Sequence, residues 1–321
     1  MPPPIARRAV LAGLAAVPAG AAAQPAEVSR IVASFPPGAA LDGIARLLAD
    51  AASRAGQGTV VVENRAGANG NIAAQAVARA RPDGRTLLLA IDTTFSLNPH
   101  LYPELGFATA DLEPVAIVGT YPVVLIVHPT AGVTDLAGFV AAARRAPLLY
   151  ASAGNGSPGH LAMEHLRATL GLPRTALEHV PFRGNAQAMT DLLAGRVQAG
   201  FIAVSGGADF VRDGRLRALA ISGPERLAML SDVPTVAEQG HAGFDVRFAY
   251  VLLVPRCTPE AAKARWATVA ADFIAAPENG GRLAGWAVSP QAGGPAEAVE
   301  WIARAHARWG EVARDSGMRI E

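Results

Sequence analysis

The fold of this chain is decided by the stretch Leu148-Leu149-Tyr150-Ala151-Ser152-Ala153-Gly154-Asn155-Gly156-Ser157-Pro158-Gly159-His160. A short apolar run meets a glycine-rich turn here, and apolar residues at helical spacing follow from Leu161 to Leu170. A strand, a loop of small residues and a helix start in this order present backbone N–H groups to an anion. The spacing Gly154-x-Gly156-x-x-Gly159 also matches the dinucleotide-binding fingerprint, so the stretch indicates an anion site or a nucleotide site.

The composition of the chain indicates two well-filled domains. Its 321 residues are 51% apolar, which excludes the disordered and fibrous classes. The net charge is +1 and Lys263 is the only lysine, with no basic run or aromatic stripe, so we expect no nucleic-acid partner. The single cysteine, Cys257, leaves the core to hold the fold without an internal disulfide.

Residues 1–23 are typical of an export signal. The pair Arg7-Arg8 precedes a short apolar run from Ala9 to Ala22, and three alanines form a small-residue cleavage pattern before Gln24. The run is too short and too interrupted for a membrane anchor, and no later stretch is apolar for long enough to span a bilayer. We therefore expect a periplasmic protein, and the arginine pair leaves the twin-arginine export route open.

Hydrophobic patterns in the first third predict alternating strands and helices. Strands are expected at 29–34, 59–64 and 86–91, with helices at 41–48 and 72–80 between them. This order favours right-handed βαβ units in a parallel sheet. Residues 92–106 are expected to form a loop, in which Thr94 offers a hydroxyl at the carboxyl end of a strand, the usual ligand side of such sheets.

The rest of the chain predicts a second unit and a return to the first. Strands are expected at 112–120, 123–128, 177–182, 196–203, 216–221 and 248–254, and helices at 139–145, 186–194, 232–238, 259–275, 282–287 and 295–316. Two crossings, the first near 127–130, predict an α/β fold of two lobes, each a mostly parallel sheet flanked by helices. The lobes are residues 27–127 with 249–321, and residues 128–248, joined at a waist that allows hinge motion.

A second junction between a strand and a helix lies near the start of the mature sequence. Phe35-Pro36-Pro37-Gly38-Ala39-Ala40 follows the first strand and precedes a helix. Asp42 in the first helical turn either meets a ligand or complements the helix dipole, and the residues alone leave both interpretations open.

No residue pattern indicates catalysis. His160 and His165 are five residues apart and do not share a helix face, so we expect no metal site, and we interpret His160 as pairing with Glu164. Ser157 lacks the glycine that a nucleophile elbow needs two positions before it, because Asn155 stands there. We therefore predict that the protein is not an enzyme.

The dinucleotide interpretation fails a stricter comparison with the fingerprint. That motif needs an acidic residue about 20 positions on, at the end of the second strand. Glu178 falls inside the expected strand, and Pro158 stands where the fingerprint helix begins to pack. We therefore expect no cofactor, and an exported oxidoreductase that binds a nucleotide at 154–159 is the alternative.

Six motifs in order resemble the extracytoplasmic substrate-binding proteins of tripartite tricarboxylate transporters, the Bug or TctC family. The resemblance extends from about Arg30 to the C-terminus. The motifs are Phe35-Pro36-Pro37-Gly38 with Asp42, Val60-Val61-Val62-Glu63-Asn64-Arg65-x-Gly67-Ala68-x-Gly70-Asn71, Pro82-Asp83-Gly84-x-Thr86-Leu87, Tyr150-Ala151-Ser152-Ala153-Gly154-Asn155-Gly156-Ser157 with His160, His179-Val180-Pro181-Phe182-x-Gly184 and Asp232-Val233-Pro234-Thr235-Val236-Ala237-Glu238.

The resemblance implies a periplasmic-binding-protein fold, type II-like, that captures a small organic carboxylate between its lobes. It also implies delivery of this ligand by a monomeric receptor to the membrane subunits of the transporter. An orphan receptor that feeds a sensor is a further alternative. Backbone amides and small hydroxyls of two facing loops would hold the carboxylate, partly through ordered waters. The implied ligand-binding residues are Phe35, Pro37, Gly38, Ala39, Asp42, Thr94, Ser152, Ala153, Gly154, Asn155, Gly156, Ser157, His160, Phe182, Arg183 and Gly184.

Departures from the family pattern make the expected cleft more apolar than usual. Ala39 replaces a glycine, Ala40-Leu41 replaces a Pro-Thr pair, Ile202 stands where an aspartate is common, and a common tryptophan is missing near Ala249. We therefore expect a monocarboxylate or dicarboxylate with an apolar or aromatic part.

Overall fold

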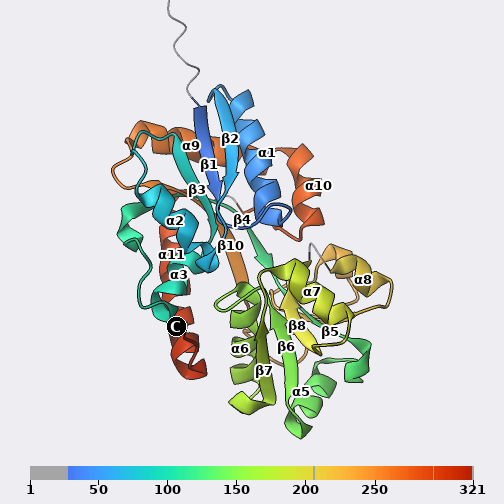
Figure 1. The fold of residues 1–321 in the computed structure, drawn as a ribbon. Coiled ribbons are helices and arrows are strands. Elements are labelled where there is room, and N and C mark those ends of the chain that lie inside the picture. The colour runs from blue at the N-terminus through green and yellow to red at the C-terminus, as the bar shows by residue number, and fades with distance from the viewer. Residues whose placement is uncertain (1–27, 205–206, 292, 320–321) are drawn as a thin grey trace, which may run out of the picture.

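Two five-stranded sheets form the two lobes of the molecule (Figure 1). The computed structural model describes residues 28–204, 207–291 and 293–319. The predicted export signal lies outside these residues. The first sheet has the strand order β2-β1-β3-β10-β4, and the second has the order β7-β6-β8-β5-β9. The predicted two-lobed α/β fold is confirmed.

The first lobe begins with the predicted βαβ units. Strand β1 (Val28–Ala33) pairs in parallel with both β2 (Thr59–Asn64) and β3 (Thr86–Ile91). Helix α1 (Ala40–Arg54) and helix α2 (Asn71–Ala78) connect them. Because side chains of β1 alternate between faces, Ile31 and Ala33 join the core under α1, whereas Val32 joins the core under α2.

Two long antiparallel strands and three helices complete this lobe. Strand β10 (Arg247–Pro255) lies between β3 and β4 (Leu112–Pro122) and runs antiparallel to both. The helices are α9 (Glu260–Ala275), α10 (Pro277–Gly285) and α11 (Pro295–Ser316). Helix α11 packs on β4 and on α6 of the second lobe, so it runs along one side of the waist, at the left in Figure 1.

The second lobe repeats the alternation of strands and helices. Its strands are β5 (Val124–Val127), β6 (Leu148–Ser152), β7 (Leu177–Pro181), β8 (Ala199–Ile202) and β9 (Arg217–Ile221). Its helices are α5 (Leu136–Arg145), α6 (Pro158–Thr169), α7 (Asn185–Leu193) and α8 (Ala208–Arg212). Strand β6 pairs in parallel with β7 and β8, whereas β5 is antiparallel to β8 and β9.

The lobe boundaries predicted from the sequence are displaced. Strand β5 belongs to the second sheet, although residues up to 127 were expected in the first lobe. The chain crosses at Val123, between β4 and β5, because Pro122 ends one run of strand residues and the next begins at Val124 without a loop. The return crossing also comes earlier, since Arg247 already pairs with Pro122 in the first sheet.

Two local predictions are wrong. Residues 92–106 include two helical turns, α3 (Thr93–Ser96) and α4 (Asn98–Leu101), because the Asp92 carbonyl accepts the Phe95 and Ser96 amides. Residues 232–238 form turns instead of a helix. The Thr235 hydroxyl accepts a hydrogen bond from the Glu238 amide at 3.0 Å, and the Glu238 carboxylate accepts one from the Thr235 amide at 2.7 Å. Thr235 also forms an isolated β-bridge with Ile221 of β9, so this segment does not continue as a helix.

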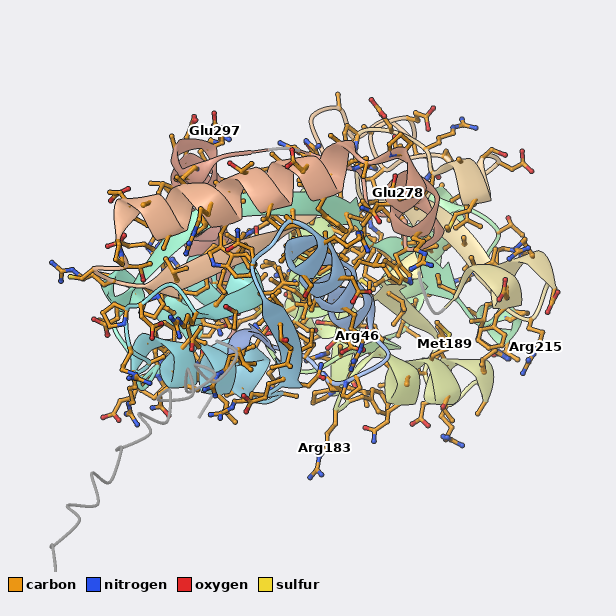
Figure 2. All side chains as sticks on the ribbon, turned by 90° about the horizontal axis from the view of Figure 1, so that it is seen from above. Arg46, Arg183, Met189, Arg215, Glu278 and Glu297 are labelled. Carbon is orange, nitrogen blue, oxygen red and sulfur yellow. The ribbon has the colours of Figure 1, made fainter. Side chains whose placement is uncertain are left out.

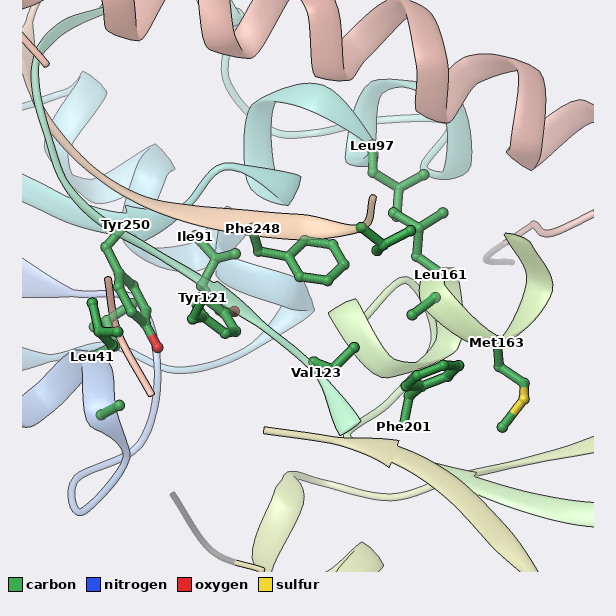
Figure 3. Close-up of a cluster of buried hydrophobic side chains, with 14 of the residues drawn as sticks. Leu41, Ile91, Leu97, Tyr121, Val123, Leu161, Met163, Phe201, Phe248 and Tyr250 are labelled. Carbon is green, nitrogen blue, oxygen red and sulfur yellow. The ribbon is translucent and has the colours of Figure 1, made fainter. Parts of the chain in front are cut away.

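A continuous hydrophobic core joins the two lobes. Leu97 and Phe248 of the first lobe belong to the same buried cluster as Leu161 and Phe201 of the second (Figure 3). Val123, at the crossing itself, is part of this cluster and 1% exposed. Among the helices that the structure describes, none is long and apolar enough to cross a membrane.

Candidate functional site

A cavity of about 750 Å³ lies between the lobes. The β1–α1 loop forms one wall, and the start of α6, the start of α7 and the end of β8 form the opposite wall. The residues lining it are Phe35, Pro36, Pro37, Gly38, Ala39, Ala40, Leu41, Ile91, Tyr121, Val123, Ala153, Pro158, Gly159, Arg183, Gly184, Asn185, Ala186, Gln187, Met189, Thr190, Leu193, Phe201, Ile202, Ala203, Phe210 and Tyr250.

Seven of the predicted site residues line this cavity, namely Phe35, Pro37, Gly38, Ala39, Ala153, Arg183 and Gly184. The other nine, Asp42, Thr94, Ser152, Gly154, Asn155, Gly156, Ser157, His160 and Phe182, are not among its lining residues. Both loops singled out in the sequence thus lie at the cavity. The sequence patterns did not separate residues that face the cavity from residues that shape the loops.

Three helix N-termini converge on the cavity. Its lining includes the first residues of α1 (Ala40 and Leu41), of α6 (Pro158 and Gly159) and of α7 (Asn185 and Ala186). The first amides of a helix lack partners within the helix and carry its partial positive charge. Backbone groups at these three positions therefore give the cavity a partial positive potential.

Asp42 holds the first loop in place. Its carboxylate accepts hydrogen bonds from the Gly38 amide at 3.1 Å, the Arg46 side chain at 3.1 Å and the Asn64 side chain at 2.9 Å. Burial opposes its ionisation, but these hydrogen bonds outweigh burial and hold the Asp42 pKa below its usual value. Gly38 has a φ of +87°, which suits glycine, so the carboxylate and the glycine together fix this turn.

The second loop, residues 153–157 between β6 and α6, is held by the side chains of Ser152, His160 and His179. The Ser152 hydroxyl donates to the Gly154 carbonyl at 2.9 Å, accepts the Gly154 amide at 3.2 Å and lies 2.6 Å from Nε2 of His179. The Gly156 amide donates to Nδ1 of His160 at 3.1 Å. These contacts set the direction of the loop amides.

Two stacked histidines support this loop from behind. The His160 and His179 rings are 3.8 Å apart between centroids and nearly parallel. Burial lowers the pKa of both, that of His179 to about 4, so both rings are neutral near pH 7. The predicted pairing of His160 with Glu164 is wrong, because Glu164 instead accepts from Tyr150 and Arg167.

Gly154 and Gly159 allow the backbone of residues 154–159 to lie close to the backbone of neighbouring segments. A Cβ on Gly159 would lie 2.2 Å from the Phe201 carbonyl oxygen, so only glycine lets α6 begin against β8. A Cβ on Gly154 would lie 3.2 Å from the Phe182 carbonyl oxygen, and Gly154 has a φ of +128°. The spacing that resembled a nucleotide fingerprint thus places the N-terminus of α6 at the cavity.

Two buried hydroxyls beside the loops have no hydrogen-bond partner among the described residues. They belong to Ser34, which directly precedes the first loop, and Ser157, which precedes α6 without capping it. Their exposures are 1% and 2%. Such groups in native proteins generally bond to a ligand or an ordered water. Ser34 was missed by the sequence patterns, and its signal was a polar residue ending a buried strand.

No charged side chain among the lining residues points into the cavity. Among the described residues of the lining, Arg183 alone is charged, and Figure 2 shows its side chain extending away from the ribbon. The remaining walls are largely apolar and aromatic, with contributions from Met189, Phe201, Ile202 and Phe210 of the second lobe. A bound anion would therefore meet dipoles at one end and apolar surface elsewhere.

A second cavity of about 600 Å³ lies on the outer side of the first lobe, against β1, β2 and α2. Its charged side chains partly neutralise one another, since Glu63 lies 3.6 Å from Arg30 and 2.6 Å from Arg65. It lacks the converging helix N-termini of the cavity between the lobes.

Known proteins resemble this chain over nearly its whole length. A family model described as "Tripartite tricarboxylate transporter family receptor" matches residues 44–318. A UPF0065 protein of Pseudomonas sp. strain P51 is 34% identical over 95% of this chain and 93% of that protein. Protein BugT of Bordetella pertussis is 31% identical over 97% of this chain and 95% of that protein.

Solved structures of other proteins also resemble this chain in fold and sequence. An R. palustris protein with adipate superposes with a TM-score of 0.85 at 30% identity, covering 92% of this chain and 99% of that chain. MatC from Rhodopseudomonas palustris with bound malate gives a TM-score of 0.79 at 27% identity, covering 90% and 99%.

Proposed function

Since the chain belongs to the tripartite tricarboxylate transporter receptor family, we propose that it is a periplasmic solute receptor for a small organic carboxylate. The observation that carries the proposal is the convergence of three helix N-termini on a cavity whose lining offers no inward cationic side chain. Related structures hold adipate and malate, which are both carboxylates.

Neutral donors suit capture followed by release. A buried ion pair would require desolvation of both charges and would oppose reopening of the lobes. Backbone amides stabilise an anion through fixed dipoles, and they carry no charge that must be neutralised once the ligand leaves. The receptor would close on its ligand and pass it to the membrane subunits of a transporter, without changing it chemically and without a cofactor.

The walls away from the loops favour a ligand with an apolar or aromatic part. Ile202 is fully buried and lines the cavity together with Met189, Leu193 and Phe210. A carboxylate placed against these side chains, away from the helix N-termini, would lose its hydration without gaining a partner. We therefore expect alkyl or aryl carboxylates to bind more tightly than citrate.

Isothermal titration against adipate, benzoate, malate and citrate tests this proposal. We expect saturable binding of adipate or benzoate and at least about tenfold weaker binding of citrate, a difference of about 1.4 kcal/mol. Thermal unfolding provides an independent readout, because a ligand at 100 times its Kd stabilises the folded state by about 2.7 kcal/mol. Tight citrate binding without binding of the apolar acids would contradict the predicted ligand class.

The variant Ile202→Asp tests the apolar wall. A carboxylate at this position would repel the ligand, so adipate affinity should fall at least about tenfold. Val299→Asp is the control for the added charge alone, because Val299 is 54% exposed on α11 and does not line the cavity. Urea unfolding of Ile202→Asp is measured alongside, because Ile202 is fully buried and a carboxylate there also destabilises the fold. Equal affinities of the two variants would show that Ile202 does not face the ligand.

A further inference from the structure

The loop between β2 and α2 has a backbone that ordinary residues avoid. Four consecutive residues have positive φ: Gly67 at 130°, Ala68 at 45°, Asn69 at 49° and Gly70 at 94°. Glycine accepts such angles and asparagine tolerates them, but alanine does not. Strained segments of this kind persist where surrounding contacts fix them, and they cluster at functional sites.

Contacts from the first lobe fix Asn69 in this conformation. Its carbonyl accepts hydrogen bonds from the Thr94 hydroxyl at 3.0 Å and from Nδ2 of Asn98 at 3.1 Å. Its own side-chain amide donates to Oδ1 of Asn98 at 2.8 Å. The orientation of the Asn69 side chain is therefore determined within the first lobe.

The second hydrogen of the Asn69 side-chain amide forms a hydrogen bond to the other lobe. Nδ2 of Asn69 donates to the Gly156 carbonyl at 2.8 Å, a contact between residues 87 positions apart in the chain. The Gly156 carbonyl can only accept, so the donor at this position must be the side-chain nitrogen. This bond joins the first lobe directly to the loop that precedes α6.

Gly156 is thereby held from both sides. Its amide donates to His160 and its carbonyl accepts from Asn69, while the next amide, that of Ser157, donates to the Gly154 carbonyl at 3.1 Å. Without the Asn69 bond, the buried Gly156 carbonyl would lose its side-chain donor, and this peptide group would be held by the Ser157 amide alone.

We propose that Asn69 is a positioning residue that couples the first lobe to the carboxylate-binding loop of the second. The bond forms only when the lobes hold their present separation, so it links the order of loop 153–157 to lobe closure. Asn69 then raises ligand affinity without touching the ligand. The affinity part of this proposal rests on the proposed function, whereas the loop-ordering part does not.

The variants Asn69→Gly and Ala68→Gly distinguish the effect of the Asn69 side chain from the effect of a change in the loop backbone. Both introduce glycine at a left-handed position of the same loop, and Ala68→Gly relieves strain there. Asn69→Gly also leaves the buried Oδ1 of Asn98 without its donor, so urea unfolding of both variants checks that each still folds. Only Asn69→Gly removes the amide. Asn69→Asp adds a third comparison, because a carboxylate keeps the shape but cannot donate to the Gly156 carbonyl.

Hydrogen exchange of the Gly156 and Ser157 amides, measured by NMR without ligand, tests the ordering of the loop. We expect exchange to be about fivefold to tenfold faster in Asn69→Gly and Asn69→Asp, the size of one neutral hydrogen bond, and unchanged in Ala68→Gly. Equal exchange in all four proteins would overturn the proposal.

Titration with adipate tests the effect on affinity. We expect Kd to rise about fivefold to tenfold in Asn69→Gly and to stay at the parent value in Ala68→Gly. Asn69→Asp is used for hydrogen exchange alone, because its added negative charge would itself weaken binding of an anion. Parent affinity in Asn69→Gly would overturn the coupling to the ligand. If the parent bound none of the carboxylates, the proposed function would fail, while the exchange experiment would still decide whether Asn69 orders the loop.

Discussion

At the scale of single residues, the site depends on neutral histidines that do not touch the cavity. Nδ1 of His160 must be unprotonated to accept the Gly156 amide, and His179 stacks directly on it. Tyr150 stacks on His179 and donates to Glu164, which is also bonded to Arg167. A proton on Nδ1 of His160 would break the contact with the Gly156 amide, and a proton on either ring would place a cation next to the other ring.

This arrangement predicts that acid destabilises the protein through His179. Burial lowers its pKa to about 4, below the value of about 6.5 in an unfolded chain. Between these values the unfolded chain binds more protons, so the free energy of unfolding falls as pH drops from about 6.5 to about 4, by at most about 3 kcal/mol.

Urea unfolding of the parent and of His179→Asn across pH 7 to 4 measures this contribution. The stability difference between them should shrink as pH falls, whereas buried groups away from His179, such as Asp92, act equally in both proteins. Asp92 makes such a control necessary, because burial raises its pKa to about 7 and gives a pH dependence of opposite sign. A stability difference that stays constant over this range would contradict the account.

At the scale of elements, the junction between β8 and α6 sets the position of the site. Gly159 lets the helix begin against the Phe201 carbonyl, and the N-terminus of α6 reaches the cavity for that reason. The apolar stripe of the helix, including Leu161, Met163 and Leu166, is fully buried and secures the same placement.

The variant Gly159→Ala should therefore move α6 away from β8. A Cβ at 2.2 Å from a backbone oxygen cannot be accommodated by a side-chain rotation, so we expect a loss of about 1–3 kcal/mol in the free energy of unfolding. Gly280→Ala is the control, because its Cβ would meet nothing within 4 Å on helix α10. Urea unfolding that ranked the control as the more damaged variant would contradict this explanation.

At the scale of the whole molecule, local patterns predicted the lobes better than their junctions. Strands such as β2 and helices such as α11 were predicted with their observed bounds, because hydrophobic period and proline placement are local signals. The crossing at Val123 was misplaced, because an unbroken apolar stretch does not mark where a chain changes sheets. Residue order cannot reveal the bond from Asn69 to Gly156 or the stacking of His160 on His179, since folding alone brings these partners together.

The central claim is that backbone amides of both lobes bind the carboxylate. Titration of the ¹⁵N-labelled protein with adipate, followed by amide NMR, tests it most directly. The account predicts saturable shifts of the Ala39 and Ala40 amides in the first lobe and of the Ala153 amide in the second, with one shared Kd. Saturable binding that left these three amides unshifted, with the shifts confined to other surfaces, would contradict it.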